Sequence, residues 1–151
     1  MKKIIINAFG RDKPGLVAKI SGIIKSSKGN IEISKMVQLE TDFTALMLVE
    51  ISKDNINVLE ESLKKVKNLN ITINSTEVRS DSDNFIKYFF SINANDNEGI
   101  IYLFSDLFKK YDINITSMDS YLKNAPLTGS PVFYLDSEVM LNSKINLNDF
   151  K

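Results

Sequence analysis

Two stretches of this chain place an aspartate and a glycine shortly before an apolar pair that starts a helical pattern. They are Asp12-Lys13-Pro14-Gly15-Leu16-Val17 and Asp96-Asn97-Glu98-Gly99-Ile100-Ile101. The N-terminus of a helix has unpaired N–H groups and the positive end of the helix dipole, so it binds anions without a catalytic side chain. The backbone at each glycine and the apolar pair could hold the carboxylate of an amino acid, and the aspartate could accept its ammonium group.

A structural interpretation of the first turn stays open beside the ligand-binding one. Asp12 is well placed to cap the helix, and Gly15 could serve only to close the turn; a cap contributes about 1 kcal/mol in either case. The second turn carries Glu98 and two asparagines where the first has a proline and two basic residues. We therefore expect the first turn to be the better carboxylate site.

The composition excludes most catalytic and metal chemistry. The 151 residues include no cysteine and no histidine, which removes disulfides, thiolate metal sites, the commonest metal ligand and the usual proton shuttle. The 19 basic residues balance 19 acidic ones, so the chain lacks the positive field that attracts DNA. We expect no enzyme, no cofactor and no direct contact with nucleic acid. The N-terminal apolar run is too short for a signal peptide and no run is long enough to span a membrane, which predicts a cytoplasmic protein.

The elements that position the first turn follow from the hydrophobic spacing. Residues 3–9 form a β-branched strand, and the helix after the turn has one apolar face and ends at Gly29 as its C′ residue. The remaining expected elements are a hairpin of residues 30–39 and 43–51, a second helix capped by Asp54, and a strand of residues 71–78. This order predicts the α+β, ferredoxin-like βαββαβ fold, with two helices on one face of a four-stranded antiparallel sheet.

The pattern restarts after a polar linker, which indicates an internal duplication. Asp96, Gly99 and Asn114 each follow their counterparts in the first half by 84 positions (96−12, 99−15 and 114−30). We expect a first domain at residues 1–79, a linker at 80–84 and a second domain at 85–151. The second domain is predicted to be C-terminally incomplete and to lack most of its last helix and strand, because only residues 142–151 follow its third strand.

The incomplete second domain has a consequence for its sheet. Without a fourth strand, the strand around Tyr88-Phe89-Phe90 would be an apolar free edge. We expect another chain or the first domain to cover this edge, which favours a homo-oligomer.

These features resemble the ACT domain family, and within it the tandem-ACT proteins of the glycine cleavage system transcriptional repressor type. The resembling segments are residues 10–17, 29–31, 43–48, 96–101 and 125–133. The resemblance implies a regulatory domain that binds a small effector, often an amino acid, at the interface between two such domains. It implies no reaction catalysed by the domain itself.

The resemblance adds two asparagines, Asn30 and Asn114, to the candidate ligand-binding residues. They open the second strand of each domain, where the family's ligand often meets a neighbouring domain. Ordinary turn residues at a strand edge are the alternative interpretation. The full set of candidate ligand-binding residues is Asp12, Gly15, Leu16, Val17, Asn30, Asp96, Gly99, Ile100, Ile101 and Asn114. No catalytic or metal-binding residue is expected.

The leading functional hypothesis is an amino-acid-responsive regulator that controls a transcriptional activator through protein–protein contact. Glycine is favoured as the effector by resemblance alone. Two alternatives stay open: an ACT-type protein-interaction module with degenerate ligand sites, and a detached regulatory subunit of a metabolic enzyme. The implied partners are an amino-acid effector, an activator protein and a second copy of the chain, with no membrane.

Overall fold

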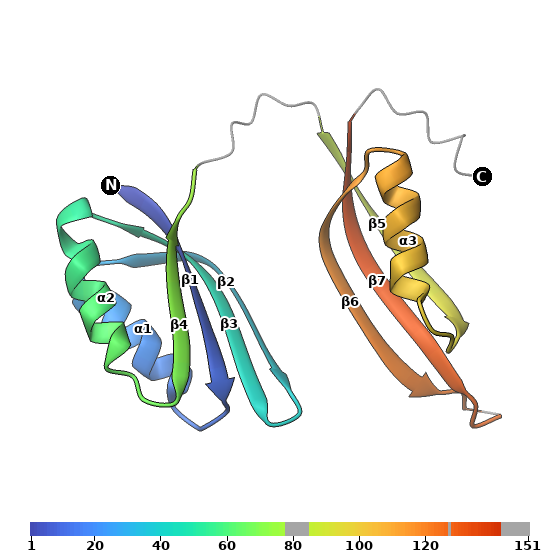
Figure 1. The fold of residues 1–151 in the computed structure, drawn as a ribbon, viewed down its shortest axis with the longest axis horizontal. Coiled ribbons are helices and arrows are strands. Elements are labelled where there is room, and N and C mark those ends of the chain that lie inside the picture. The colour runs from blue at the N-terminus through green and yellow to red at the C-terminus, as the bar shows by residue number, and fades with distance from the viewer. Residues whose placement is uncertain (78–84, 127, 143–151) are drawn as a thin grey trace. The chain divides into compact units, whose positions relative to one another are not determined.

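A computed structural model describes residues 1–77, 85–126 and 128–142 of the chain. The chain divides into two compact units, Met1–Arg79 and Ser80–Lys151, and each is described by itself. In both units the helices cover one face of an antiparallel sheet (Figure 1). The predicted α+β class and the tandem ferredoxin-like units are confirmed. The predicted linker at 80–84 lies outside the described residues.

Unit 1 contains a complete βαββαβ sequence of elements. They are β1 (Lys2–Arg11), α1 (Leu16–Ser26), β2 (Asn30–Leu39), β3 (Asp42–Ile51), the 3-10 helix η1 (Lys53–Asn55), α2 (Ile56–Lys64) and β4 (Leu69–Ser75). The strands are ordered β2-β3-β1-β4, and every neighbouring pair is antiparallel. This places β1 in the middle of the sheet, so the turn that follows it rests on a strand held from both sides.

The core of unit 1 lies between the sheet and its two helices. Ile4, Ile6 and Ala8 alternate along β1 and are fully buried, as expected for one face of a strand. They pack in one cluster with Ile24 of α1 and Leu59 of α2. Each fully buried large aliphatic side chain contributes about 1.5–3 kcal/mol relative to exposure. Both helices are therefore fixed to the sheet by apolar contact.

Unit 2 contains only part of this arrangement within its described residues. Its elements are β5 (Phe85–Asn95), α3 (Ile100–Lys110), β6 (Asn114–Asn124) and β7 (Pro131–Asn142). The strands are ordered β5-β7-β6, which repeats the order of β1, β3 and β2. Residues 85–126 and 128–142 contain no counterpart of α2 or β4. In these residues β5 pairs with β7 and with no other strand.

The duplication extends to details of the backbone. α3 follows α1 by 84 positions at both ends (100−16 and 110−26), and both helices follow a left-handed glycine. β2 and β6 each contain one irregular position, at Glu32 and Thr116, which are also 84 apart (116−32). The third strands are 90 apart, because Leu141 pairs with Ile86 as Ile51 pairs with Lys2 (141−51). Six extra residues therefore lie in the second hairpin connection.

The predicted cap of α1 is wrong. Asp12 lies one turn before the helix, Gly15 occupies the N-cap position, and no side chain caps the helix. The reason is an additional turn, in which the Leu16 N–H donates to the Lys13 carbonyl at 3.3 Å. Pro14 accordingly precedes the first helical turn and does not belong to it.

Two further predicted caps are also wrong. The left-handed residue after α1 is Lys28, with φ 59°, and not Gly29. Gly29 is instead needed for close packing, because a Cβ there would lie 3.0 Å from Ile24. Asp54 lies inside η1, and Asn55 occupies the N-cap position of α2 without a side-chain hydrogen bond.

Candidate functional site

The first candidate site is the connection between β1 and α1. The Asp12 N–H donates to the Thr41 carbonyl at 3.0 Å and so ties the turn to the tip of the β2–β3 hairpin. Gly15 has φ 89°, and a Cβ there would meet nothing within 4 Å. The glycine is therefore required by its left-handed backbone, and the space above it is open.

The N–H groups of this turn differ in their availability to a ligand. The Leu16 N–H is already directed at the Lys13 carbonyl, and the first bond of the helix runs from Lys19 to Gly15 at 2.9 Å. Within the described residues, no hydrogen bond is made by the N–H of Val17 or of Ala18. The predicted donor at Val17 is thus available, whereas the one at Leu16 is partly occupied.

The side chains around the first turn are accessible to solvent. Those of Asp12 and Lys13 are exposed, Val17 is 43% exposed, and Leu16 is half-buried against the core. An exposed carboxylate beside available backbone N–H groups presents both an acceptor and donors to one small molecule. This pairing matches the two charged ends of an amino acid.

The second candidate site repeats this geometry with different charges. Gly99 has φ 83°, the Leu103 N–H donates to its carbonyl at 3.0 Å, and Asp96 is exposed. Ile100 is buried and Ile101 is 43% exposed, as Leu16 and Val17 point inward and outward in the first turn. The backbone is equally suited to an anion, but the exposed carboxylate of Glu98 repels one.

The asparagines that open the second strands do not lie beside the turns. Asn30 pairs with Glu50, which also pairs with Lys3 near the start of β1, whereas the turn follows Arg11 at the other end. The residues between Lys3 and Arg11 span roughly 26 Å at about 3.3 Å per residue. Asn114 occupies the same position in unit 2. An asparagine and an aspartate from one unit therefore cannot contact the same small ligand.

Sequence reasoning did not identify the polar contacts at the two strand irregularities. In unit 1, Lys3 Nζ lies 2.6 Å from Glu32 Oε2. This hydrogen bond raises the pKa of the Lys3 ammonium above its usual value, and the charges of Glu32 and Glu50 add to the effect. The 84-residue repeat could have revealed the feature, because Lys87 is the counterpart of Lys3.

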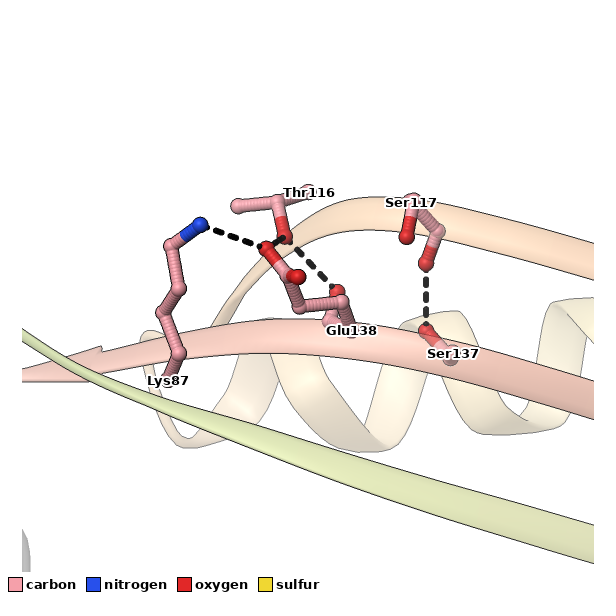
Figure 2. Close-up of polar contacts among 5 residues, drawn as sticks. All are labelled: Lys87, Thr116, Ser117, Ser137 and Glu138. Atoms are coloured by element: carbon pink, nitrogen blue, oxygen red, sulfur yellow. Dashed lines mark hydrogen bonds and ion pairs between the residues drawn. The ribbon is translucent and has the colours of Figure 1, made fainter.

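Unit 2 builds the same contact from different residues. Lys87 Nζ lies 3.0 Å from Glu138 Oε1, and Thr116 Oγ1 lies 2.8 Å from the same oxygen and 3.0 Å from the Glu138 carbonyl (Figure 2). The Ser137 hydroxyl donates to the Ser117 carbonyl at 2.8 Å. These groups supply hydrogen bonds where the ladder between β6 and β7 is interrupted. The cluster stabilises the irregular strand.

A large apolar cavity opens on the helix-covered face of unit 2. Its volume is about 330 Å³, and all ten of its lining residues are aromatic or aliphatic. Phe90 and Phe108 form part of its wall and meet edge to face, with ring centroids 4.9 Å apart. A cavity of this composition offers almost no partner for a charged amino acid. It is therefore separate from the candidate effector sites.

Two further findings limit the chemistry of the described residues. No group of three acidic residues in residues 1–77, 85–126 and 128–142 is arranged to hold a metal ion. In the same residues, no helix has the length and apolar character needed to cross a membrane.

Comparison with known proteins places these sites in context. The ACT domain family model matches residues 2–76, which include the first turn. A UPF0237 protein from Methanococcus maripaludis is 34% identical over 68 residues, covering 44% of this chain and 76% of that protein. The glycine cleavage system transcriptional repressor of Escherichia coli is 28% identical over 120 residues, covering 78% of this chain.

The chain spans 63% of the length of the Escherichia coli repressor. A crystal structure of an unknown protein from Galdieria sulphuraria has the same fold over nearly the whole chain. Its TM-score is 0.85 at 22% identity, covering 99% of this chain and 86% of that one.

Proposed function

This chain belongs to the ACT domain family, and from that premise we propose that it is an amino-acid-responsive regulatory protein without catalytic activity. Its effector site is the turn between β1 and α1. One observation carries the proposal: an exposed aspartate precedes a left-handed glycine, and the helix N–H groups just beyond that glycine are available. The similarity to a transcriptional repressor of the glycine cleavage system favours glycine as the effector.

The assignment of roles follows from charge. The N–H groups of Val17 and Ala18 bind the effector's carboxylate at the positive end of α1. Asp12 accepts its ammonium group. Arg11 and Lys13, which are exposed on either side of Asp12, favour an anion at this turn over the second one.

A second copy of the chain completes this proposed site. Because Asn30 lies at the far end of its own sheet, an asparagine that contacts the same effector, such as Asn114, comes from another unit, and we assign that unit to a second copy of the chain. The protein therefore acts as a homo-oligomer, and the effector changes how the oligomer presents itself to a protein partner. We propose that this partner is a transcriptional activator, contacted without binding DNA, as the resemblance to tandem-ACT repressors implies.

Titration calorimetry tests the effector site. Glycine and a panel of other amino acids are titrated into the wild-type chain, Asp12→Ala, Asp96→Ala and the control Asp54→Ala, whose carboxylate is exposed but distant from the turn. Losing a hydrogen bond to a charged group weakens binding roughly tenfold to a hundredfold, so Asp12→Ala should show this loss. Asp54→Ala should bind like wild type. If no amino acid binds the wild-type chain, the proposal is contradicted. Equal affinities of Asp12→Ala and the control Asp54→Ala would contradict it as well.

Analytical ultracentrifugation at the calorimetry concentrations tests the second copy. We expect a dimer or larger species. A monomer with full effector affinity would show that one copy suffices.

Capture from native lysate, with and without glycine, tests the partner. Glycine should release the partner from the wild-type chain and not from Asp12→Ala. Equal capture by both proteins at every glycine concentration would instead support the interaction-module alternative, which the unfavourable Glu98 of the second turn already suggests for unit 2.

A further inference from the structure

The sheet of unit 1 carries a groove of about 370 Å³ on the face away from α1 and α2 (Figure 1). Strand pairing places Ile33, Leu48 and Ile5 side by side on β2, β3 and β1, where they form part of its floor. Leu46 lies two residues before Leu48 on the same face. Ile33 is 60% exposed and Leu46 is 49% exposed. The solvated face of an antiparallel sheet is usually polar, so a hollow with an apolar floor indicates a binding surface.

Unit 2 has polar side chains at the corresponding positions of its own sheet. They are Ser117, Asp136 and Glu138, the counterparts of Ile33, Leu46 and Leu48. The backbone plan that the two units share therefore does not require an apolar surface on this face. The apolar floor of the groove is specific to unit 1.

The rim of the groove offers an available cation. Lys35 lies opposite Leu46, and within the part of the chain that the structure describes its ammonium group makes no ion pair. The other lysine of the lining, Lys3, is already bonded to Glu32 at 2.6 Å. The counterpart of Lys35 in unit 2 is an aspartate, Asp119. Unit 1 thus presents a positive charge directly beside an apolar floor.

We propose that this groove binds a small monocarboxylic acid with a branched aliphatic chain. The carboxylate of the acid pairs with the ammonium group of Lys35 through a charge-assisted hydrogen bond. The aliphatic chain lies on Leu46, Leu48 and Ile33 and removes their exposed apolar surface from water. The volume of the groove is near the lower end of the range for small-molecule sites, which suits a ligand of this size.

A carboxylate on the far side of the groove restricts the ligand to a single negative charge. Glu77 follows β4 and lines the groove, whereas Lys35 lies on β2, and the strands are ordered β2-β3-β1-β4. Three strand spacings of about 4.8 Å separate the two sides of the groove by roughly 14 Å. A dicarboxylic acid that extends from Lys35 across the floor would bring its second charge toward Glu77 and be repelled.

An amino acid suits this groove less well than it suits the turn before α1. With its carboxylate on Lys35, its ammonium group would lie close to a like charge and over aliphatic side chains that offer it no hydrogen bond. Residues 12–18, which contain the proposed effector site, do not line the groove. The groove is therefore a second site with a different ligand, and the proposal does not rest on the amino-acid effector.

Titration of the full chain with 4-methylpentanoate and with its neutral analogue 4-methylpentanamide tests the role of charge. Two-dimensional NMR follows the backbone amide signals of β2 and β3. Because a hydrogen bond to a charged group is lost, the acid should bind Lys35→Gln roughly tenfold more weakly than wild type. The neutral analogue should bind both proteins alike. Lys67→Gln changes an exposed lysine outside the groove and should bind the acid like wild type.

Several results would overturn the proposal. They are no binding of the acid, equal binding of the acid and its neutral analogue by wild type, and equal affinities of Lys35→Gln and Lys67→Gln for the acid. Binding that weakens as the protein concentration rises would show that a second copy of the chain occupies the groove, which would also overturn it. Glycine affinity, measured by calorimetry, should be the same in Lys35→Gln as in wild type, and an equal loss of both ligands would contradict two separate sites.

A second pair of variants tests the apolar floor. Ile33→Thr should weaken binding of 4-methylpentanoate several-fold, because it removes apolar surface while keeping a β-branched side chain in the strand. Val37 lies on the same strand and face, is 46% exposed and does not line the groove, so Val37→Thr is the matched control and should bind like wild type. Equal affinities of these two variants would show that the aliphatic chain does not lie on β2.

Discussion

The two units share a backbone plan and differ in what encloses it. Gly10 of unit 1 lies against the chain that enters β4, and a Cβ there would collide with the Asn68 carbonyl. Unit 2 has Ala94 at this position and no such neighbour in its described residues. Gly29, which unit 1 needs for close packing, is replaced by Ile113, which lines the cavity. Unit 2 therefore has larger side chains at the two positions where the packing of unit 1 requires glycine.

The backbone of the turns before α1 and α3 is the same in both units, although the cores of the two units differ. Gly15 and Gly99 have φ values of 89° and 83°, although the described residues of unit 1 include α2 and β4 and those of unit 2 include no counterpart of either. The turn geometry therefore depends on local backbone preference, while burial of the sheet depends on α2 and β4 or their substitutes. Substitutions can separate these two contributions.

The largest expected difference is in the free energy of unfolding when the same residue type, valine, is truncated in the two cores. Val49 and Val139 are counterparts, 0% and 3% exposed. Truncating Val49 to alanine should cost about 2 kcal/mol of unfolding free energy, from lost transfer energy and a new cavity. Val139→Ala should cost less, because Val139 already borders the cavity. Hydrogen exchange read separately in each unit measures both values. Equal costs would mean that the two cores are packed equally well.

The next effect should be the same in both units. Gly15→Ala and Gly99→Ala force alanine into a left-handed backbone, which costs about 1 kcal/mol. Gly22→Ala is the control, because Gly22 lies inside α1 with open space around it and should gain up to about 1 kcal/mol of helix stability. Thermal unfolding, together with hydrogen exchange read separately in each unit, measures the stability of the three variants. A much larger cost at one turn would show that the turns are not equivalent.

The smallest effect concerns Lys3 and Glu32 of unit 1. Because the folded state raises the pKa of Lys3, its contribution to stability is fully present below the ordinary lysine value of 10.5 and is lost as the pH rises through the folded value. Glu32→Gln should therefore be less stable than wild type at neutral pH, and the difference should vanish in strongly alkaline solution. Denaturant titrations at several pH values test this, with the exposed Glu61→Gln as control. A difference that persists above the lysine range would exclude Lys3 as its source.

The sequence predicted the fold because hydrophobic periodicity and the repeat are properties of whole segments. The spacing in α1 and α3 and the sheet order of unit 1 both follow from such patterns. The helix caps were mispredicted because an aspartate before a helix is a common cap, whereas here a left-handed glycine adds a turn.

The strand irregularities limited prediction at the level of single residues. Ile31 pairs with Val49 and Ile33 with Leu48, so two residues that simple alternation puts on one face lie on opposite faces. Ile33 is accordingly 60% exposed. For the same reason Glu32 and Thr116 carried no sequence signal of their own. The candidate turns were found, but their separation from Asn30 and Asn114 depends on strand register, which the sequence did not specify.

The hairpin connections carry an evolutionary consequence. The tip of the first hairpin is tied to the candidate site, because Thr41 accepts the hydrogen bond of the Asp12 N–H. Among the described residues of unit 2, no such bond joins Asp96 to the β6–β7 connection, which holds the six additional residues. Insertions at the first tip would displace the site, while those at the second would leave it in place. Length variation among descendants of the ancestral duplication should therefore accumulate in the second hairpin, and that loop is the place to insert an affinity tag.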